Sequence, residues 1–168
     1  CEDGYYTIED HSLSRGCTGE CSAVPGQFCL YDGSPPTPCP AGSHCAGLTS
    51  RPALCRAGYY CTGGADSPTP SGEGSTGGRC PLGHFCPGGS SSARANPCPG
   101  GRYGVVEGLT NSSCSGLCAP NHFCDEGSVS HTASPCLRHE PSSELGSATI
   151  ASCVNRWVMC PPPQPPDA

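Results

Sequence analysis

The feature that most constrains this chain is a short cysteine motif that recurs along it. Two cysteines enclose five residues, or seven in the first copy, at 21–29, 39–45, 55–61, 80–86 and 118–124. Three residues before the closing cysteine stands a glycine, except in the last copy, where Asn121 replaces it. Glycine tolerates a positive φ and asparagine is its usual substitute there, so each motif predicts a tight turn with one left-handed residue. The predicted turn glycines are Gly26, Gly42, Gly58 and Gly83.

The residue before the closing cysteine is aromatic or histidine in every copy. These residues are Phe28, His44, Tyr60, Phe85 and Phe123. A disulfide is the nearest apolar surface in such a short loop, so we expect each ring to cover the neighbouring disulfide. The motif is therefore interpreted as a structural joint between two neighbouring loops.

A longer version of the motif begins at CEDGYYT (1–7) and at CPGGRYG (98–104), where Thr7 and Gly104 replace the closing cysteine. Both copies continue with the spacing C-x15-C-x3-C, so the chain repeats at a higher level with a period of 97 residues. Internal repeats of this kind predict a quasi-one-dimensional array in which each unit touches mainly its neighbours.

The composition requires cross-links in place of a core. Leu, Ile, Val and Phe supply only 20 of the 168 residues, whereas 17 residues are cysteine. Such a chain cannot build a shared hydrophobic core, and disulfides stabilise small secreted scaffolds that lack one. We expect an extracellular, secreted or cell-surface protein that forms an elongated rod of cysteine-stapled loops. Helix should be scarce, and short β-ribbons are expected around YYT (5–7), RYGVV (102–106) and TIASCV (149–154).

The pairing of 17 cysteines cannot be decided from sequence alone. One hypothesis joins each closing cysteine to the next opening one, with short pairs using the rest: Cys29–Cys39, Cys45–Cys55, Cys61–Cys80, Cys86–Cys98, Cys124–Cys136, Cys17–Cys21, Cys114–Cys118 and Cys153–Cys160. This hypothesis leaves Cys1 unpaired or paired outside the chain, as in a fragment of a longer array. An interleaved pattern, as in EGF-like modules, would instead give pairs such as Cys39–Cys55 and Cys80–Cys98.

The spacing divides the chain into five segments. A long repeat ending in C-x3-C occupies 1–28, tandem short repeats occupy 29–97, a second long repeat and a short repeat occupy 98–135, a divergent repeat occupies 136–160, and a proline-rich tail occupies 161–168. A third, looser long unit runs from Cys136 to Cys153 within the divergent segment. The tail should adopt extended polyproline II and serve as a solvated rod or linker.

The C-P-x-G-x-[YF]-C units and the longer CPGGRYGVVEGLTNSSC unit resemble the ephrin-receptor-like cysteine-rich repeats, which are similar in style to TNF-receptor and EGF-like modules. The resemblance covers nearly the whole chain and is best over 1–136. Such repeats occur in animal receptors, in large surface proteins of protists and algae, and in the glycoproteins of algal flagellar hairs (mastigonemes). The absence of Lys and the proline-rich tail resemble the algal or protist kind. The departures are Asn121, the seven-residue connector of 21–29, and 136–160.

Charge and motif content argue against several classes of function. The net charge is −6 and the eight basic residues, all Arg, form no basic stripe, so nucleic-acid binding is not expected. The chain has no C-x2-C knuckle for zinc, and no G-x-S-x-G, H-E-x-x-H or phosphate-binding loop. It contains no apolar run near the roughly 20 residues of a membrane span. We therefore expect neither an enzyme nor a metal, cofactor or transmembrane segment.

Covalent sugar has better support. Asn111-Ser112-Ser113 is the one N-glycosylation sequon. Candidates for O-linked sugar on threonine or hydroxylated proline are Pro35, Pro36, Thr37, Pro38, Pro161, Pro162 and Pro163, and SPTPS at 67–71 is similar. Arg156, Trp157 and Met159 form either a candidate interface or a plug over the last disulfide.

Two classes of function remain. The first is a glycosylated structural rod that stacks with copies of itself, or with related repeat proteins, in an extracellular filament, flagellar hair or wall. The second is a receptor ectodomain whose modules present loops to a protein ligand. The higher-order repeat, the proline-rich tail and the lack of catalytic motifs favour the structural class.

Overall fold

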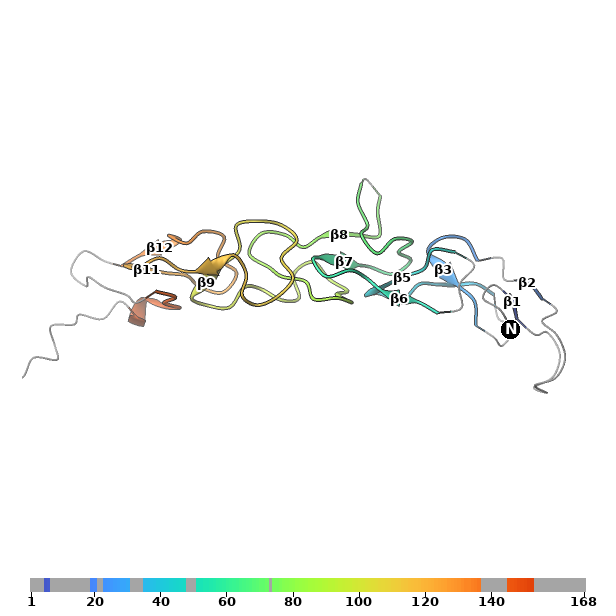
Figure 1. Ribbon diagram of the computed structural model, residues 1–168, viewed down its shortest axis with the longest axis horizontal. Helices are drawn as coiled ribbons and strands as arrows, with labels where there is room; N and C mark the ends of the chain where they lie inside the picture. The colour runs from blue at the N-terminus through green and yellow to red at the C-terminus, as the bar shows by residue number, and fades with distance from the viewer. Residues whose placement is uncertain are drawn as a thin grey trace, which may run out of the picture.

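The chain forms a slender rod in which successive repeats follow one another along its length (Figure 1). The computed structural model describes residues 5–6, 19–20, 23–30, 35–47, 51–72, 74–136 and 145–152. The first ribbon, β1 (Tyr5–Tyr6) with β2 (Gly19–Glu20), lies towards one end. The last ribbon, β11 (His122–Phe123) with β12 (Ser134–Pro135), lies towards the other. Order along the chain is therefore order along the rod.

Every ribbon is a pair of antiparallel strands of two or three residues. The other four are β3 (Gln27–Phe28) with β4 (Thr37–Pro38), β5 (Ser43–His44) with β6 (Ala53–Leu54), β7 (Tyr59–Cys61) with β8 (Gly77–Arg79), and β9 (Arg102–Tyr103) with β10 (Gly116–Leu117). In each, the residues after a turn pair with the residues that precede the next opening cysteine. At 80–86 a single bridge between His84 and Pro97 takes the place of the ribbon.

The prediction of a small disulfide-rich fold with short ribbons is confirmed. Strands lie at two of the expected places, β1 within 5–7 and β9 within 102–106. The strand expected around 149–154 is wrong, because Ile150–Ser152 forms a short 3-10 helix, η1. The alternation of polar and apolar residues there is too short to distinguish the two conformations.

The strand register repeats after 97 residues. Tyr6 lies opposite Gly19 in the first long repeat, and Tyr103 lies opposite Gly116 in the second. Each residue of the second pair stands 97 positions after its counterpart in the first. Equal spacing in the sequence therefore produces the same local structure.

The interior of the rod consists mainly of cysteine. The largest side chains with less than 2 % exposure are all cysteines, while aliphatic side chains such as Leu54 and Val105 are 69 % and 53 % exposed. Within the described residues, the buried apolar clusters contain only cysteine and alanine. Disulfides thus occupy the place that a hydrophobic core holds in other folds.

Candidate functional site

The disulfides close within single repeats. Five have both cysteines in the described part of the chain: Cys39–Cys45, Cys55–Cys61, Cys80–Cys86 and Cys118–Cys124, each with a sequence separation of 6, and Cys98–Cys114, with a separation of 16. All ten cysteines between 39 and 124 are accounted for in this way. Each of these repeats therefore contains one covalent ring that is closed by its own disulfide.

This pairing corrects the hypothesis drawn from the sequence. The hypothesis is wrong for Cys29–Cys39, Cys45–Cys55, Cys61–Cys80, Cys86–Cys98, Cys114–Cys118 and Cys124–Cys136, and the interleaved pairs Cys39–Cys55 and Cys80–Cys98 are wrong as well. The left-handed turn reverses the chain and brings the two ends of each motif together. Their Cα atoms lie 5.7 to 6.3 Å apart, the spacing that a disulfide requires.

Two further cysteines are oxidised, but their partners lie outside the described residues. Cys29 and Cys136 are also disulfide-bonded, each to a cysteine outside the described residues. The predicted pairs Cys17–Cys21 and Cys153–Cys160, and the predicted unpaired Cys1, lie outside the described residues.

The turn residues have the positive φ that the motif predicts. The φ angles are 89° at Gly26, 84° at Gly42, 87° at Gly58, 73° at Gly83 and 62° at Asn121. Gly101, the equivalent residue of the second long repeat, has φ 84°. Asparagine therefore takes the same left-handed conformation where it replaces glycine.

Backbone hydrogen bonds join each repeat to the next. The Gly58 N–H donates to the Cys86 carbonyl at 2.8 Å, and the Gly58 carbonyl accepts from the Cys80 N–H at 2.9 Å. The Cys61 N–H donates to the Ser90 carbonyl at 2.9 Å. The Gly89 N–H donates back to the Cys55 carbonyl at 2.9 Å. We call this set of four bonds the ladder.

The ladder recurs between four successive pairs of repeats. The bond from a turn glycine to the closing position of the next repeat is 2.8 Å long at Gly26–Cys45, Gly42–Cys61, Gly83–Gly104 and Gly101–Cys124. All four bonds are present between the repeats that open at Cys39 and Cys55, Cys55 and Cys80, Cys80 and Cys98, and Cys98 and Cys118. Because every bond joins backbone atoms, the side chains of the repeats can vary without changing it.

A second column of glycines, missed by the sequence reasoning, explains why the turn residue is glycine. These downstream glycines are Gly64, Gly89, Gly108, Gly127 and Gly146. A Cβ on Gly58 would lie 2.6 Å from the carbonyl oxygen of Gly108, which belongs to the repeat after next. The turn glycines Gly26, Gly42, Gly83 and Gly101 meet the carbonyls of Gly64, Gly89, Gly127 and Gly146 in the same way. Contacts therefore reach the second neighbour, beyond the nearest-neighbour array that the repeats predict.

The downstream glycines also clarify the divergent segment. Gly108 stands ten residues after Cys98, and Gly146 stands ten residues after Cys136. The Gly108 N–H donates to the Cys80 carbonyl, and the Gly146 N–H donates to the Cys118 carbonyl, at 2.8 and 3.0 Å. Cys136 and Gly146 thus occupy the places that Cys98 and Gly108 hold in a long repeat. A glycine three residues after a closing cysteine, as in Gly64, Gly89 and Gly127, is the signal that could have revealed this column.

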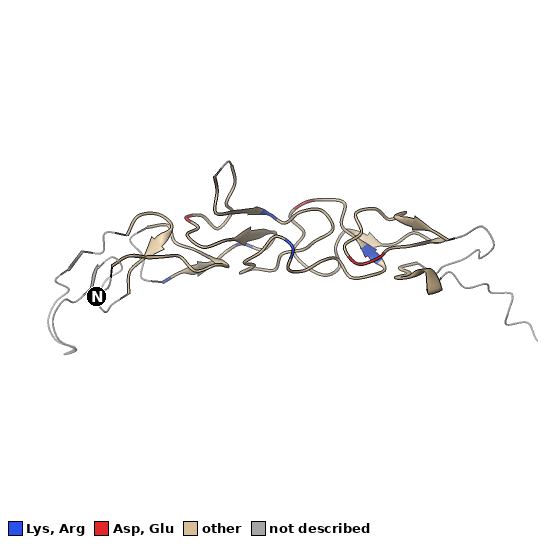
Figure 2. Ribbon diagram, turned by 180° about the vertical axis from the view of Figure 1, so that it is seen from behind, with Lys and Arg blue, Asp and Glu red and all other residues tan. Residues whose placement is uncertain are grey.

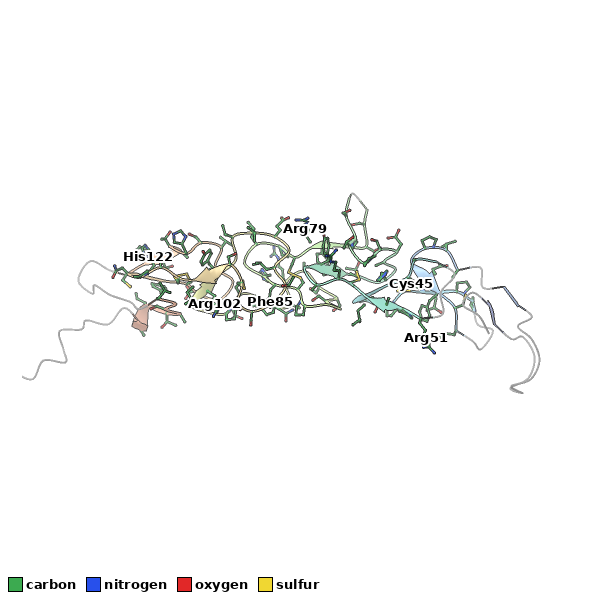
Figure 3. All side chains as sticks on the ribbon, viewed as in Figure 1. Cys45, Arg51, Arg79, Phe85, Arg102 and His122 are labelled. Atoms are coloured by element: carbon green, nitrogen blue, oxygen red, sulfur yellow. A yellow bond between two sulfur atoms is a disulfide. The ribbon has the colours of Figure 1, made fainter. Side chains whose placement is uncertain are left out.

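The side chains form a thin layer around this backbone (Figure 3). The ring of Tyr60 lies against Gly78 on the facing strand, and the ring of Tyr103 lies against Gly116. The Arg79 guanidinium carbon lies 5.8 Å from the centre of the Tyr59 ring. The tyrosines thus cover the glycine-rich strands that face them.

Two histidines of the turns, His84 and His122, make local contacts. Nδ1 of His84 lies 3.1 Å from the Leu82 carbonyl oxygen, and Nδ1 of His122 lies 3.0 Å from that of Pro120. The described cysteines hold their sulfur in disulfides, so these sulfurs are not thiolate ligands. Within the described residues, no three His, Cys, Asp or Glu side chains gather at one point that could hold a metal ion.

The glycine-rich segment 63–78 is partly docked on the rod. Pro70 is buried, and the Pro68 carbonyl accepts a hydrogen bond of 3.0 Å from the Arg56 N–H. The loop between β7 and β8 leaves the rod beyond this point (Figure 1). Gly74 in this loop has φ 75°, and a Cβ there would meet no atom within 4 Å.

The N-glycosylation sequon lies on an exposed turn. Asn111, Ser112 and Ser113 are all exposed, and the Ser113 N–H donates to Asn111 Oδ1 at 2.9 Å. The disulfide of Cys114 follows immediately and anchors the turn. The sequon is therefore accessible to modification.

The other predicted modification and interface residues are divided between described and undescribed parts. Pro35, Thr37 and Pro38 are exposed, Pro36 is half-buried, and Thr37 and Pro38 form β4. Pro161, Pro162, Pro163, Arg156, Trp157 and Met159 lie outside the described residues. Basic and acidic residues are few and spread along the rod (Figure 2).

Comparison with known proteins assigns no family. A scan against models of known protein families finds no match. A search of curated proteins finds none of significant similarity. Among the described residues, no helix is long and apolar enough to cross a bilayer. The disulfides are typical of an oxidising compartment, and they support a secreted or extracellular location.

Proposed function

We propose that the protein is a structural element of an extracellular assembly, a glycosylated rod that stacks with copies of itself or with related repeat proteins. The observation that carries this proposal is the ladder, which joins four successive pairs of repeats through the same backbone atoms. A ladder that depends on glycine and cysteine positions builds length without a core. Length and stiffness are the properties that a filament subunit needs.

The described surface fits a structural role. The chain has no catalytic motif, and a hollow of about 420 Å³ among the described residues lies open beside the loop that contains Asp66 and Ser75. Exposed aliphatic side chains occur along the rod, among them Leu54, Val105 and Leu117. Side-by-side packing of rods would cover them.

The resemblance to ephrin-receptor-like repeats narrows the proposal. Such repeats occur in animal receptors, in large surface proteins of protists and algae, and in the glycoproteins of algal flagellar hairs. The absence of Lys and the proline-rich tail favour the algal or protist kind, so a flagellar or cell-wall filament is the setting we propose. The exposed sequon at Asn111 and the exposed residues Pro35, Thr37 and Pro38 would carry the sugar of such a glycoprotein.

The test is electron microscopy of the oxidised, glycosylated protein across a range of concentrations, with sedimentation velocity on the same samples. We expect fibrils with a fixed axial repeat, and a concentration-dependent increase in sedimentation coefficient. A reduced and alkylated sample is the control and should form none. Single rods that remain dispersed and bind a separate protein would contradict the proposal and support a receptor ectodomain.

A further inference from the structure

The covalent and non-covalent links of the rod are segregated. Between Cys39 and Cys124 every disulfide closes inside one repeat. The links from one repeat to the next are the ladder, the short ribbons and the polypeptide connector, and the glycine–glycine contacts reach the repeat after next. Tension along the rod therefore falls on hydrogen bonds, while the disulfide rings stay closed.

We propose that the rod is a mechanical extender: under tension, repeats separate one interface at a time and each releases a connector of defined length. The inference rests on the proposed structural role, in which a filament subunit bears load. It follows from the ladder, because each complete interface is closed by its own four bonds of 2.7 to 3.0 Å, and the contact of a turn glycine with a downstream glycine couples an interface only to the one after it. Buried apolar side chains do not join the described repeats into one cooperative core.

The connectors determine how far the rod extends. Nine residues lie between Cys45 and Cys55, eighteen between Cys61 and Cys80, and eleven between Cys86 and Cys98. A fully extended chain spans at most about 3.3–3.6 Å per residue, so the longest connector reaches about 65 Å. The disulfide rings limit further extension, because each keeps its two Cα atoms about 6 Å apart.

Reduction should then release additional, countable lengths. A thiolate attacks one sulfur to form a mixed disulfide, and the other sulfur leaves as a thiolate. Opening a ring with a separation of 6 adds about 15 Å, whereas opening the Cys98–Cys114 ring, with a separation of 16, adds about 50 Å. Four short increments and one long increment are expected between Cys39 and Cys124.

The test stretches single full-length, oxidised molecules between handles at the two ends in an optical trap. We expect successive extension steps before reduction. After dithiothreitol is added, we expect increments of about 15 Å and of about 50 Å, among them the four short and one long increment of the rings between Cys39 and Cys124. One all-or-none step for the whole rod would overturn the inference. A rod that does not lengthen until it is reduced would also overturn it, because disulfides would then join the repeats.

Two variants show which repeats give rise to which extension steps. Gly58→Ala places a Cβ against Gly108 and should lower the force of the steps that involve these repeats, while the other steps keep the wild-type force. Gly74→Ala, in the open loop, is the matched control and should leave all steps unchanged. A drop in every step of Gly58→Ala would show that the rod unfolds as one unit and would overturn the inference. The measurement uses single molecules, so its outcome does not depend on whether the protein forms fibrils.

Discussion

The substitution Gly58→Ala tests whether the ladder depends on the missing Cβ. Gly58 has φ 87°, and its Cβ would lie 2.6 Å from the Gly108 carbonyl oxygen, whereas real Cβ contacts do not fall below 3.0 Å. The left-handed conformation costs an alanine about 1–2 kcal/mol, partly offset by the lower entropy of its unfolded chain. The Gly108 carbonyl must also withdraw, which disturbs the bonds of Gly58 and Gly108 to Cys86 and Cys80.

Three ladder bonds meet at this point, and each contributes about 0.5–1.5 kcal/mol net. We therefore expect Gly58→Ala to destabilise the local structure by about 3–5 kcal/mol. Gly74→Ala, with φ 75° and no atom within 4 Å, should cost about 1 kcal/mol. The difference of about 2–4 kcal/mol is the contribution of the close approach itself.

Native-state hydrogen exchange of the oxidised protein measures this difference amide by amide. The amides of residue 58, Cys80 and Gly108, which donate these three bonds, should exchange about 30- to 700-fold faster in Gly58→Ala than in Gly74→Ala, at about 1.4 kcal/mol for each factor of ten. The amide of Gly127, two repeats beyond Cys80, should keep its protection. Equal effects of the two substitutions would refute the reasoning.

A further variant separates the two causes. Asparagine adopts a left-handed φ readily, as Asn121 does here at 62°, yet it carries a Cβ. If φ alone selected glycine, Gly58→Asn would be nearly silent. If the contact with Gly108 decides, Gly58→Asn should be as damaging as Gly58→Ala, and a silent Gly58→Asn would contradict our account of the second glycine column.

Three other predictions follow from the pairing and the exposed turns. Non-reducing peptide mapping should recover Cys21–Cys29 and Cys136–Cys153, by extension of the within-repeat rule, and leave Cys160 as the odd thiol; a Cys153–Cys160 peptide would contradict this extension. A single protease site inserted beside Gly74 should, after cleavage and denaturation without reductant, give two separate fragments on a gel, because the rings on either side close locally; one band would mean that a disulfide crosses the loop. Asn111→Gln should remove one glycan mass from the secreted protein and change stability by less than about 0.5 kcal/mol, since the side chain is exposed; an unchanged mass would show that the sequon is unused.

The sequence could predict the parts of this fold that depend on a few neighbouring residues. The left-handed turn at Gly83 or Asn121 follows from the spacing of residues within one motif, and the 97-residue period predicts the matching register of Tyr6 and Tyr103. The scarcity of aliphatic residues likewise excludes a shared core. Each of these inferences concerns backbone sterics or composition, which are local properties.

The pairing of the cysteines could not be read in the same way. Cys45 has Cys39 six residues away on one side and Cys55 ten residues away on the other, and both distances are compatible with a disulfide. Only the direction in which the turn closes distinguishes the two, and it brings Cys39 to Cys45 with their Cα atoms 5.9 Å apart. With this pairing, every disulfide between Cys39 and Cys124 closes within one repeat, and none joins two repeats.

The sequence by itself therefore determined that this chain is a repetitive, disulfide-stapled array, because spacing and composition leave no other source of order. The tertiary structure decided how the array holds together. Gly58 and Gly108 are 50 residues apart, yet the approach of their backbones in space is what requires the glycine at position 58. Such a contact leaves no sign in the spacing of a single motif, because it depends on how one repeat stacks over the next two.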